Sequence, residues 1–148
     1  GKADDWVEKS LLNVNQHEIA HIQLGSISLE RKEGRWILGG VDENKELDPD
    51  TVKSLIAKLS HLNFKNLLGT EDKPDYQMEQ PVLSIELTME NGDLIKYQFG
   101  KPEKTDDFIV KSSTHPYYFT ISKNVLNAIM QMDKENLIKA NPTSTDDA

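Results

Sequence analysis

The chain has 148 residues, of which 36% are hydrophobic and 28% are charged. This is the usual size of one globular domain, and a chain of this length buries about 70% of its unfolded surface without needing a disulfide or a metal. The net charge is −8. An acidic chain is a poor partner for nucleic acid and does not dock unassisted on an anionic membrane, because both need a basic patch.

The chain contains no cysteine, which excludes a thiol nucleophile. The absence of cysteine agrees slightly better with an extracytoplasmic location than with a cytoplasmic one. No stretch approaches the ~20 apolar residues of a membrane span. The chain starts at Gly1 without a methionine, so we expect a signal or anchor segment upstream in the full-length protein.

The first 40 residues predict a short helix and then strands. Capping-box spacing predicts a helix over residues 5–12. From Ile22 apolar and polar residues alternate, and the alternation changes phase at Gly25-Ser26, where we expect a bulge or bend. A hairpin turn at residues 32–34 then leads into a strand over residues 35–38.

The strongest helix signal follows that strand. Asp48 is a good N-cap and Pro49 a good first-turn residue. The apolar residues after them fall on one helical face: Val52, Leu55, Ile56, Leu59 and Leu62. A short strand over residues 64–68 and a polar linker over residues 71–80 complete this half.

The second half opens with a strand over residues 83–89 and a return strand over residues 95–99. Between them Asn91-Gly92 predicts a two-residue hairpin turn with positive φ at both positions. Two further strands are expected over residues 108–111 and 117–121. Asn124 is expected to cap a last helix that turns four side chains inward: Val125, Ile129, Met130 and Met132.

These elements predict an α+β fold of two related units, each made of antiparallel strands followed by an amphipathic helix. We expect a single domain over residues 5–138, with units at about 17–70 and 81–138. Residues 139–148 form a polar tail that we expect to be disordered. Two copies of one pattern favour duplication over a solenoid.

One run matches the zinc-protease motif H-E-x-x-H: His17-Glu18-Ile19-Ala20-His21. In such enzymes two histidines one helical turn apart bind zinc, and the glutamate activates the bound water. Here an alternating strand already begins at Ile22, and the metzincin continuation is missing. The candidate third ligands Glu43, Glu46 and Glu71 lie in polar loops. We therefore interpret the run as a chance match at a loop-to-strand boundary, with a zinc-dependent hydrolase as a remote alternative.

The remaining polar residues predict no catalytic site. His61 is expected near a helix C-terminus and His115 in a turn. Four aspartates are interpreted as caps or solvated charge: Asp48, Asp50, Asp106 and Asp107. There is no EF-hand loop, P-loop, G-x-S-x-G or G-x-G-x-x-G motif. We therefore assign no catalytic residue, metal ligand or cofactor.

Aromatic residues are considered as binding residues. Trp36 is expected in the core, facing the first helix. Tyr117 and Tyr118 point to opposite faces of their strand, so that one is expected to be exposed. A small-ligand or glycan site would need a deep pocket between the units, lined by Trp36, Tyr97 or Tyr118.

The order of these features resembles the bacterial domain-of-unknown-function 4340 family. The matching positions run from residue 5 to about 138: Asp5-Trp6-Val7, Leu11-Leu12, Ile19, Ile22, Leu24, residues 34–38, the helix over 52–59, Tyr76, Met78, Pro81, Phe99-Gly100-Lys101, residues 108–111, Tyr118-Phe119 and Ile121. Gln77-Met78 departs from the Gly-Leu pair that the family often has before the proline.

The resemblance implies an envelope protein with an N-terminal signal or anchor, and many such domains are encoded near ABC-transporter components of the gliding-motility type. It supplies no catalytic residues. We therefore expect a non-enzymatic extracytoplasmic accessory domain that binds a protein partner in the envelope, with a small-ligand or glycan-binding domain as the alternative.

Overall fold

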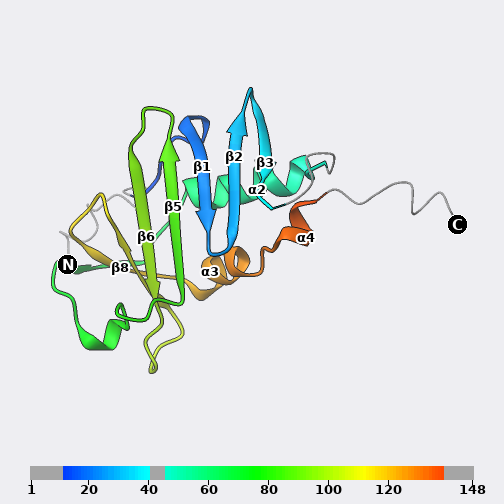
Figure 1. Ribbon diagram of the computed structural model, residues 1–148. Helices are drawn as coiled ribbons and strands as arrows, with labels where there is room; N and C mark the ends of the chain where they lie inside the picture. Colours follow the sequence, from blue (N-terminus) through cyan, green and yellow to red (C-terminus); the bar gives the residue numbers. More distant parts are fainter. Residues whose placement is uncertain (1–11, 41–45, 139–148) are drawn as a thin grey trace, which may run out of the picture.

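The computed structural model describes residues 12–40 and 46–138, which form one antiparallel sheet with helices on one face (Figure 1). In these residues the sheet has eight strands, in the order β3-β2-β1-β5-β6-β7-β8-β4. The strands are β1 (Ile19–Leu24), β2 (Ile27–Lys32), β3 (Arg35–Leu38), β4 (Asn66–Gly69), β5 (Leu83–Met89), β6 (Leu94–Gly100), β7 (Phe108–Ser112) and β8 (Tyr118–Ile121). An α+β architecture is thus confirmed.

Helices α2 (Pro49–Ser60), α3 (Lys123–Met130) and α4 (Lys134–Leu137) lie together on one side of the sheet (Figure 1). Helix α2 begins as the sequence predicts, because the Asp48 side chain accepts hydrogen bonds from the backbone N–H groups of Asp50 and Thr51. Four of the five residues of its expected apolar face, Val52, Leu55, Ile56 and Leu59, are buried in the helix, whereas Leu62 is buried beyond the helix end at Ser60. Two short 3₁₀ turns complete the elements, η1 (Gln16–Glu18) and η2 (Pro74–Tyr76).

The two halves of the chain join in the middle of the sheet. Strands β1 to β3 run outward from β1 to one edge, and β5 to β8 run outward from β5. Strand β1 pairs with β5, with Ile22 opposite Leu87. Helix α2 then carries the chain across, so that β4 pairs with β8 at the far edge. The interpretation of residues 17–70 and 81–138 as two related units stays a prediction.

One face of every central strand contributes to a continuous core beneath the helices. Ile22, Leu87 and Phe99 are fully buried there and pack with the apolar side chains of α2 and α3. A register shift between Ile19 and His21 lets both Ile19 and Ile22 point into this core. The opposite face of β1, β5 and β6 is largely polar, as alternation requires.

The turn η2 covers part of this opposite face. Tyr76 is buried, and its ring centroid lies 5.4 Å from that of Tyr118. Burial, with the nearby charge of Asp72 and the Tyr76 phenol, raises the pKa of Tyr118. Ile109, opposite Gly100 on β7, is buried although it lies outside the main core. The expected polar linker over residues 71–80 therefore includes a packed turn.

Two expectations about turns are wrong. Gly25-Ser26 is a two-residue hairpin turn and not a bulge, because Leu24 pairs with Ile27 and Gly25 takes a φ of +55°. Between β5 and β6, three residues lie inside the loop that the hydrogen bond from Met89 N–H to the Asp93 carbonyl oxygen closes. Within this loop Gly92 N–H donates to the Met89 carbonyl oxygen. Only Gly92 in that loop has positive φ, which is the type I turn with a bulge rather than the expected primed turn. The turn after Lys32 is as predicted, with positive φ at Glu33 and Gly34.

The last helix differs from its expectation at both ends. Its N-cap is Ser122, whose Oγ accepts from the backbone N–H of Asn124, so the predicted cap lies two residues too late. Leu126 and Ile129 form its buried face. Met130 was expected to point inward and is 43% exposed instead, because the helix ends there. The short α4 was not predicted.

The expected helix over residues 5–12 and the tail over residues 139–148 lie outside the described residues. In the described part of the chain, no helix combines the length and the apolar character that crossing a bilayer requires.

Candidate binding cleft

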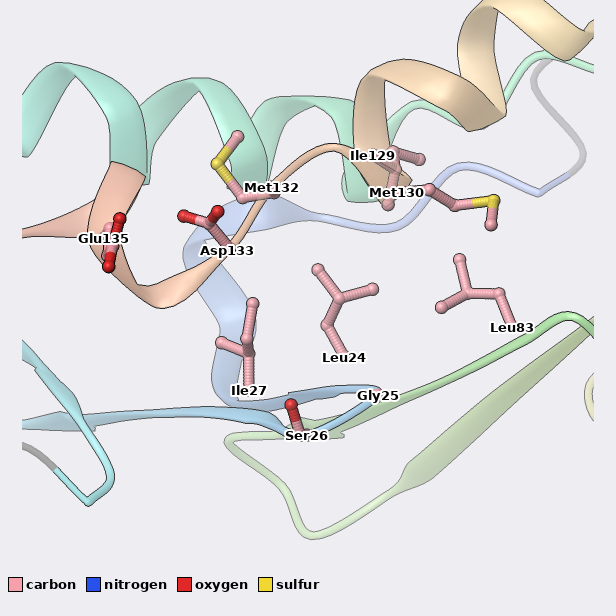
Figure 2. A pocket seen from close by; sticks show the side chains of 10 residues that line it. All are labelled: Leu24, Gly25, Ser26, Ile27, Leu83, Ile129, Met130, Met132, Asp133 and Glu135. Atoms are coloured by element: carbon pink, nitrogen blue, oxygen red, sulfur yellow. The ribbon is translucent and has the colours of Figure 1, made fainter.

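A cleft of about 520 Å³ lies at one end of the seam between the two halves of the sheet. Figure 2 shows its ten lining residues, which come from the β1–β2 turn, the start of β5, the end of α3 and the connection to α4. They are Leu24, Gly25, Ser26, Ile27, Leu83, Ile129, Met130, Met132, Asp133 and Glu135. The cleft thus joins residues that are about a hundred positions apart in the sequence.

The floor of the cleft is apolar because core residues at the β1–β2 turn form it. Leu24 and Ile27 pair across the two-residue turn and are both buried. Leu83, the first residue of β5, points toward the same space from the other side (Figure 2). The hairpin turn therefore sets two apolar side chains side by side at the cleft base.

The opposite wall is built by α3 and the residues after it. Ile129 is fully buried and continues the core, whereas Met130 is exposed and Met132 is partly buried. Methionine side chains are unbranched and polarizable, so they adapt to differently shaped apolar partners. This wall can therefore adjust its shape without disturbing the core below it.

The α4 end of the cleft is acidic. Asp133 is the N-cap of α4, and its Oδ1 accepts from the backbone N–H of Asn136 at 2.9 Å. Asn136 Oδ1 in turn accepts from the backbone N–H of Asp133 at 3.1 Å, which completes a capping box. These bonds fix the Asp133 carboxylate at the rim, and the exposed Glu135 lies in the first turn of the same helix.

The structure places the zinc-like run where the sequence predicts, at a loop-to-strand boundary. His17 is an exposed residue of η1, whereas His21 lies within β1 and its Nε2 is 2.9 Å from Ser28 Oγ. The two histidines therefore do not share a helix, as the zinc motif requires. Of the three candidate third ligands, Glu43 lies outside the described residues, and Glu46 and Glu71 are exposed. Within the described ranges, no three acidic or histidine side chains are grouped as a metal would need.

The contact between His21 and Ser28 joins neighbouring strands on the polar face of the sheet. A catalytic serine needs a base that is oriented by a third group and oxyanion donors within reach. Among the described residues no carboxylate is hydrogen-bonded to the His21 ring. The pair is therefore explained as a cross-strand hydrogen bond.

The aromatic residues that the sequence suggested for a ligand site do not line the cleft. Tyr97 is fully buried, and its hydroxyl donates to the carbonyl oxygen of Leu12 at 3.3 Å. Trp36 is partly buried against the core, with the Arg31 guanidinium 5.7 Å from its ring centroid. Tyr118 packs on Tyr76, and Tyr117 is the exposed member of its pair.

The other polar candidates have structural contacts. Asp48 caps α2, and His61 is its C-cap residue, with Nδ1 3.1 Å from the carbonyl oxygen of Ala57. Asp107 accepts from Lys65 at 2.8 Å, and Asp106 lies 3.9 Å from Lys123. Asp50 lies in the first turn of α2.

His115 is partly buried in the turn between β7 and β8. Its backbone carbonyl oxygen accepts a hydrogen bond from Lys111 Nζ at 2.5 Å. Burial lowers the pKa of Lys111.

Sequence reasoning did not find the cleft. The sequence predicts Ile129 as an inward residue of the last helix, but it gives no sign that Leu24, Ile27 or Asp133 lines a cleft. The only local signals were the apolar run Ile129-Met130 with Met132, and Asp133 three residues before Asn136. Neither signal identifies a cleft, because the cleft forms only where the fold places the β1–β2 turn next to the end of α3.

Searches of curated proteins and of solved structures find no match to the chain. The sequence profile of a family described as a domain of unknown function, DUF4340, matches residues 1–81. The matched region includes β1 to β4, α2 and η2, whereas the resemblance at Phe99-Gly100-Lys101 and beyond lies outside it. Because the match spans more than half of the chain, this protein belongs to the DUF4340 family.

Proposed function

We propose that this chain is a non-enzymatic domain that binds a protein partner, and that the cleft is its contact site. The observation that carries the proposal is the apolar surface at the cleft mouth. Met130 is 43% exposed there, and the partly buried Leu83 faces it across the opening (Figure 2). Met132 is also partly buried and lies further along the same wall, toward Asp133. Methionine is enriched at protein interfaces, and a partner that covers these side chains would remove apolar surface from water.

The chemistry of the cleft supports binding rather than catalysis. Its ionisable lining residues are the two carboxylates of Asp133 and Glu135, and neither contacts a histidine, lysine or hydroxyl in the described structure. Ser28 and His21, the one serine–histidine pair described above, lie on the polar face, away from the helices. Nothing in the lining would activate a nucleophile or stabilise an oxyanion.

The same proposal includes the cell envelope as the site of action and an ABC-transporter system as the setting. Its support is the cysteine-free sequence and what the family resemblance implies. Fractionation of the host cell, followed by purification of the tagged full-length protein from each fraction, tests this part. Recovery from the cytoplasm alone would contradict it.

Site-specific photo-crosslinking in the host cell tests the cleft as the contact site. A photoreactive amino acid replaces Ser26 or Met130 at the cleft, or Lys96 on the exposed polar face as the control. We expect the same adduct mass from Ser26 and Met130 and none from Lys96. Adducts from Lys96 alone, or none at the two cleft positions, would show that the cleft is not the contact.

A second candidate function is the binding of a small ligand, which the cleft volume favours. About 520 Å³ lies within the range of small-molecule sites. A glycan is the weaker form of this candidate, since no aromatic ring lines the cleft. A purified small molecule that raises the melting temperature of the wild type but not of Ser26→Trp would support this alternative over a protein partner.

A further inference from the structure

We infer that the occupant of the cleft is a protein segment with an aliphatic side chain close to a lysine or arginine. This inference rests on the proposed function and specifies the chemistry of the partner. It follows from the cleft having two chemically different ends, which Figure 2 shows in one view.

The apolar end lies between Leu83 and Met130, whose side chains point toward one another across the opening (Figure 2). Leu24 lies to the side of Leu83, and Ile27 lies further along the same floor, toward Asp133 (Figure 2); Leu24 and Ile27 belong to the buried core. An aliphatic side chain placed here would contact apolar groups from the sheet and from α3. Each buried CH₂ group contributes about 0.8 kcal/mol, or roughly a fourfold gain in affinity.

The acidic end lies at Asp133 and Glu135 (Figure 2). Both charged residues of the lining are acidic, and Asp133 is held in place by its bonds within the capping box. Because the Asp133 carboxylate is already held in one position, it loses less conformational entropy when a partner binds than a freely rotating carboxylate would. A cationic side chain beside the aliphatic one would therefore be favoured over an acidic one, in keeping with the net charge of −8.

This polarity disfavours other occupants. An acidic peptide or a phosphate-bearing ligand would meet like charge at the rim, in a domain that is acidic throughout. A wholly apolar segment would place no positive charge near the carboxylates of Asp133 and Glu135. A basic residue next to an aliphatic one satisfies both ends of the cleft.

The test uses the whole ¹⁵N-labelled chain and four acetylated, amidated pentapeptides in NMR titrations. The sequences are Ser-Leu-Ser-Lys-Ser, Ser-Leu-Ser-Glu-Ser, Ser-Leu-Ser-Gln-Ser and Ser-Ser-Ser-Lys-Ser. We expect the first to shift the amide signals of the β1–β2 turn and of the α3–α4 connection. It should bind about fivefold more tightly than the glutamate peptide, since an exposed charge pair contributes up to about 1 kcal/mol, which is about a fivefold change in affinity.

Two charge-reversal variants localise the effect. Glu135→Lys should abolish the preference for the lysine peptide, whereas Glu103→Lys, the same charge change at an exposed residue outside the cleft, should keep it. In 0.5 M salt the preference should shrink, because screening weakens exposed charge pairs.

Equal binding of the lysine and glutamate peptides at the cleft would overturn this inference and leave the proposed function intact. Signal shifts elsewhere, or none with any peptide, would overturn it as well. In that case the crosslinks at Ser26 and Met130 would still decide whether a protein partner contacts the cleft.

Discussion

The carbonyl oxygen of Tyr76 lies against Gly100, in the space that a side chain at position 100 would need. A Cβ built on Gly100 would overlap that oxygen and would lie only 2.9 Å from the sulfur of Met78. Gly100 is the last residue of β6, and Tyr76 ends the 3₁₀ turn η2. This close approach seats the segment between β4 and β5 on the face of the sheet that the helices leave open.

Gly100→Ala should therefore dislodge this segment. Overpacking of this kind costs about 1–3 kcal/mol, and here the obstacle is backbone, which cannot rotate away. Urea denaturation measures the loss, and Glu-C cleavage after the exposed Glu71 and Glu79 should become faster. Gly39→Ala is the control, because its nearest neighbour is the Ser28 Cβ at 3.3 Å and neither glycine has positive φ. Equal effects of the two changes would show that the Tyr76 contact does not decide the stability.

The buried phenol of Tyr97 predicts a stability that falls at alkaline pH. Burial raises the pKa of Tyr97 from 10.0 to about 12. Below pH 10 the folded and unfolded chains both hold the proton, so its stabilising effect is fully present. Between pH 10 and 12 the unfolded chain releases the proton first, and stability falls by up to about 1.4 kcal/mol per pH unit.

Tyr97→Phe isolates this contribution. At pH 7 the variant should be less stable by about 1 kcal/mol, because it loses the hydrogen bond to the Leu12 carbonyl. Between pH 10 and 12 its curve should fall less steeply than that of the wild type. Denaturation at each pH provides the measurement, with Tyr117→Phe as a control on an exposed ring. Parallel curves for Tyr97→Phe and the wild type would contradict the prediction.

The His17–His21 run predicts no tight zinc binding. His17 lies on a 3₁₀ turn and His21 within a strand, where its ring already contacts Ser28. After dialysis against zinc and then against buffer, we expect well under one zinc per chain. Zinc should also shift the melting temperature of the wild type no more than that of His17→Ala. Stoichiometric zinc that is lost in His17→Ala would restore the hydrolase alternative.

Elements set by nearby residues could be predicted from the sequence. The Asp48 cap and the apolar face of α2 lie within a few residues of one another, so the local pattern contains what the structure uses. The turn at Glu33-Gly34 follows in the same way. At Gly25-Ser26 the change of phase predicted a bulge or bend, whereas the structure has a hairpin turn, because a phase change alone does not show whether the chain continues or turns back.

Features that depend on distant segments could not be predicted. The pairing of β4 with β8 joins Asn66 to Thr120, and nothing near either residue specifies its partner. The cleft likewise needs Leu24 and Met130 to meet. Sequence pattern shows that a side chain is apolar, but whether it is covered depends on where its helix ends. Met130 is exposed because α3 stops at that residue.

At the start of α3 the structure uses a different N-cap residue from the one that the sequence predicts. Ser122 directly follows β8, and its Oγ accepts from the backbone N–H of Asn124 at 3.1 Å. Asn124 is a good cap by residue type, yet its exposed side chain is already inside the first turn. Ser122→Ala should therefore cost about 1 kcal/mol, the usual loss when an N-cap is removed.

Asn124→Ala should leave stability unchanged or raise it by a few tenths of a kcal/mol, because alanine is the better helix former inside a helix. Urea denaturation of the two single variants and the double variant provides the measurement. The double variant should be no less stable than Ser122→Ala alone, since the Ser122 bond uses the Asn124 backbone and not its side chain. If Asn124→Ala proved the more costly change, Asn124 and not Ser122 would be the N-cap, and α3 would begin two residues later than described.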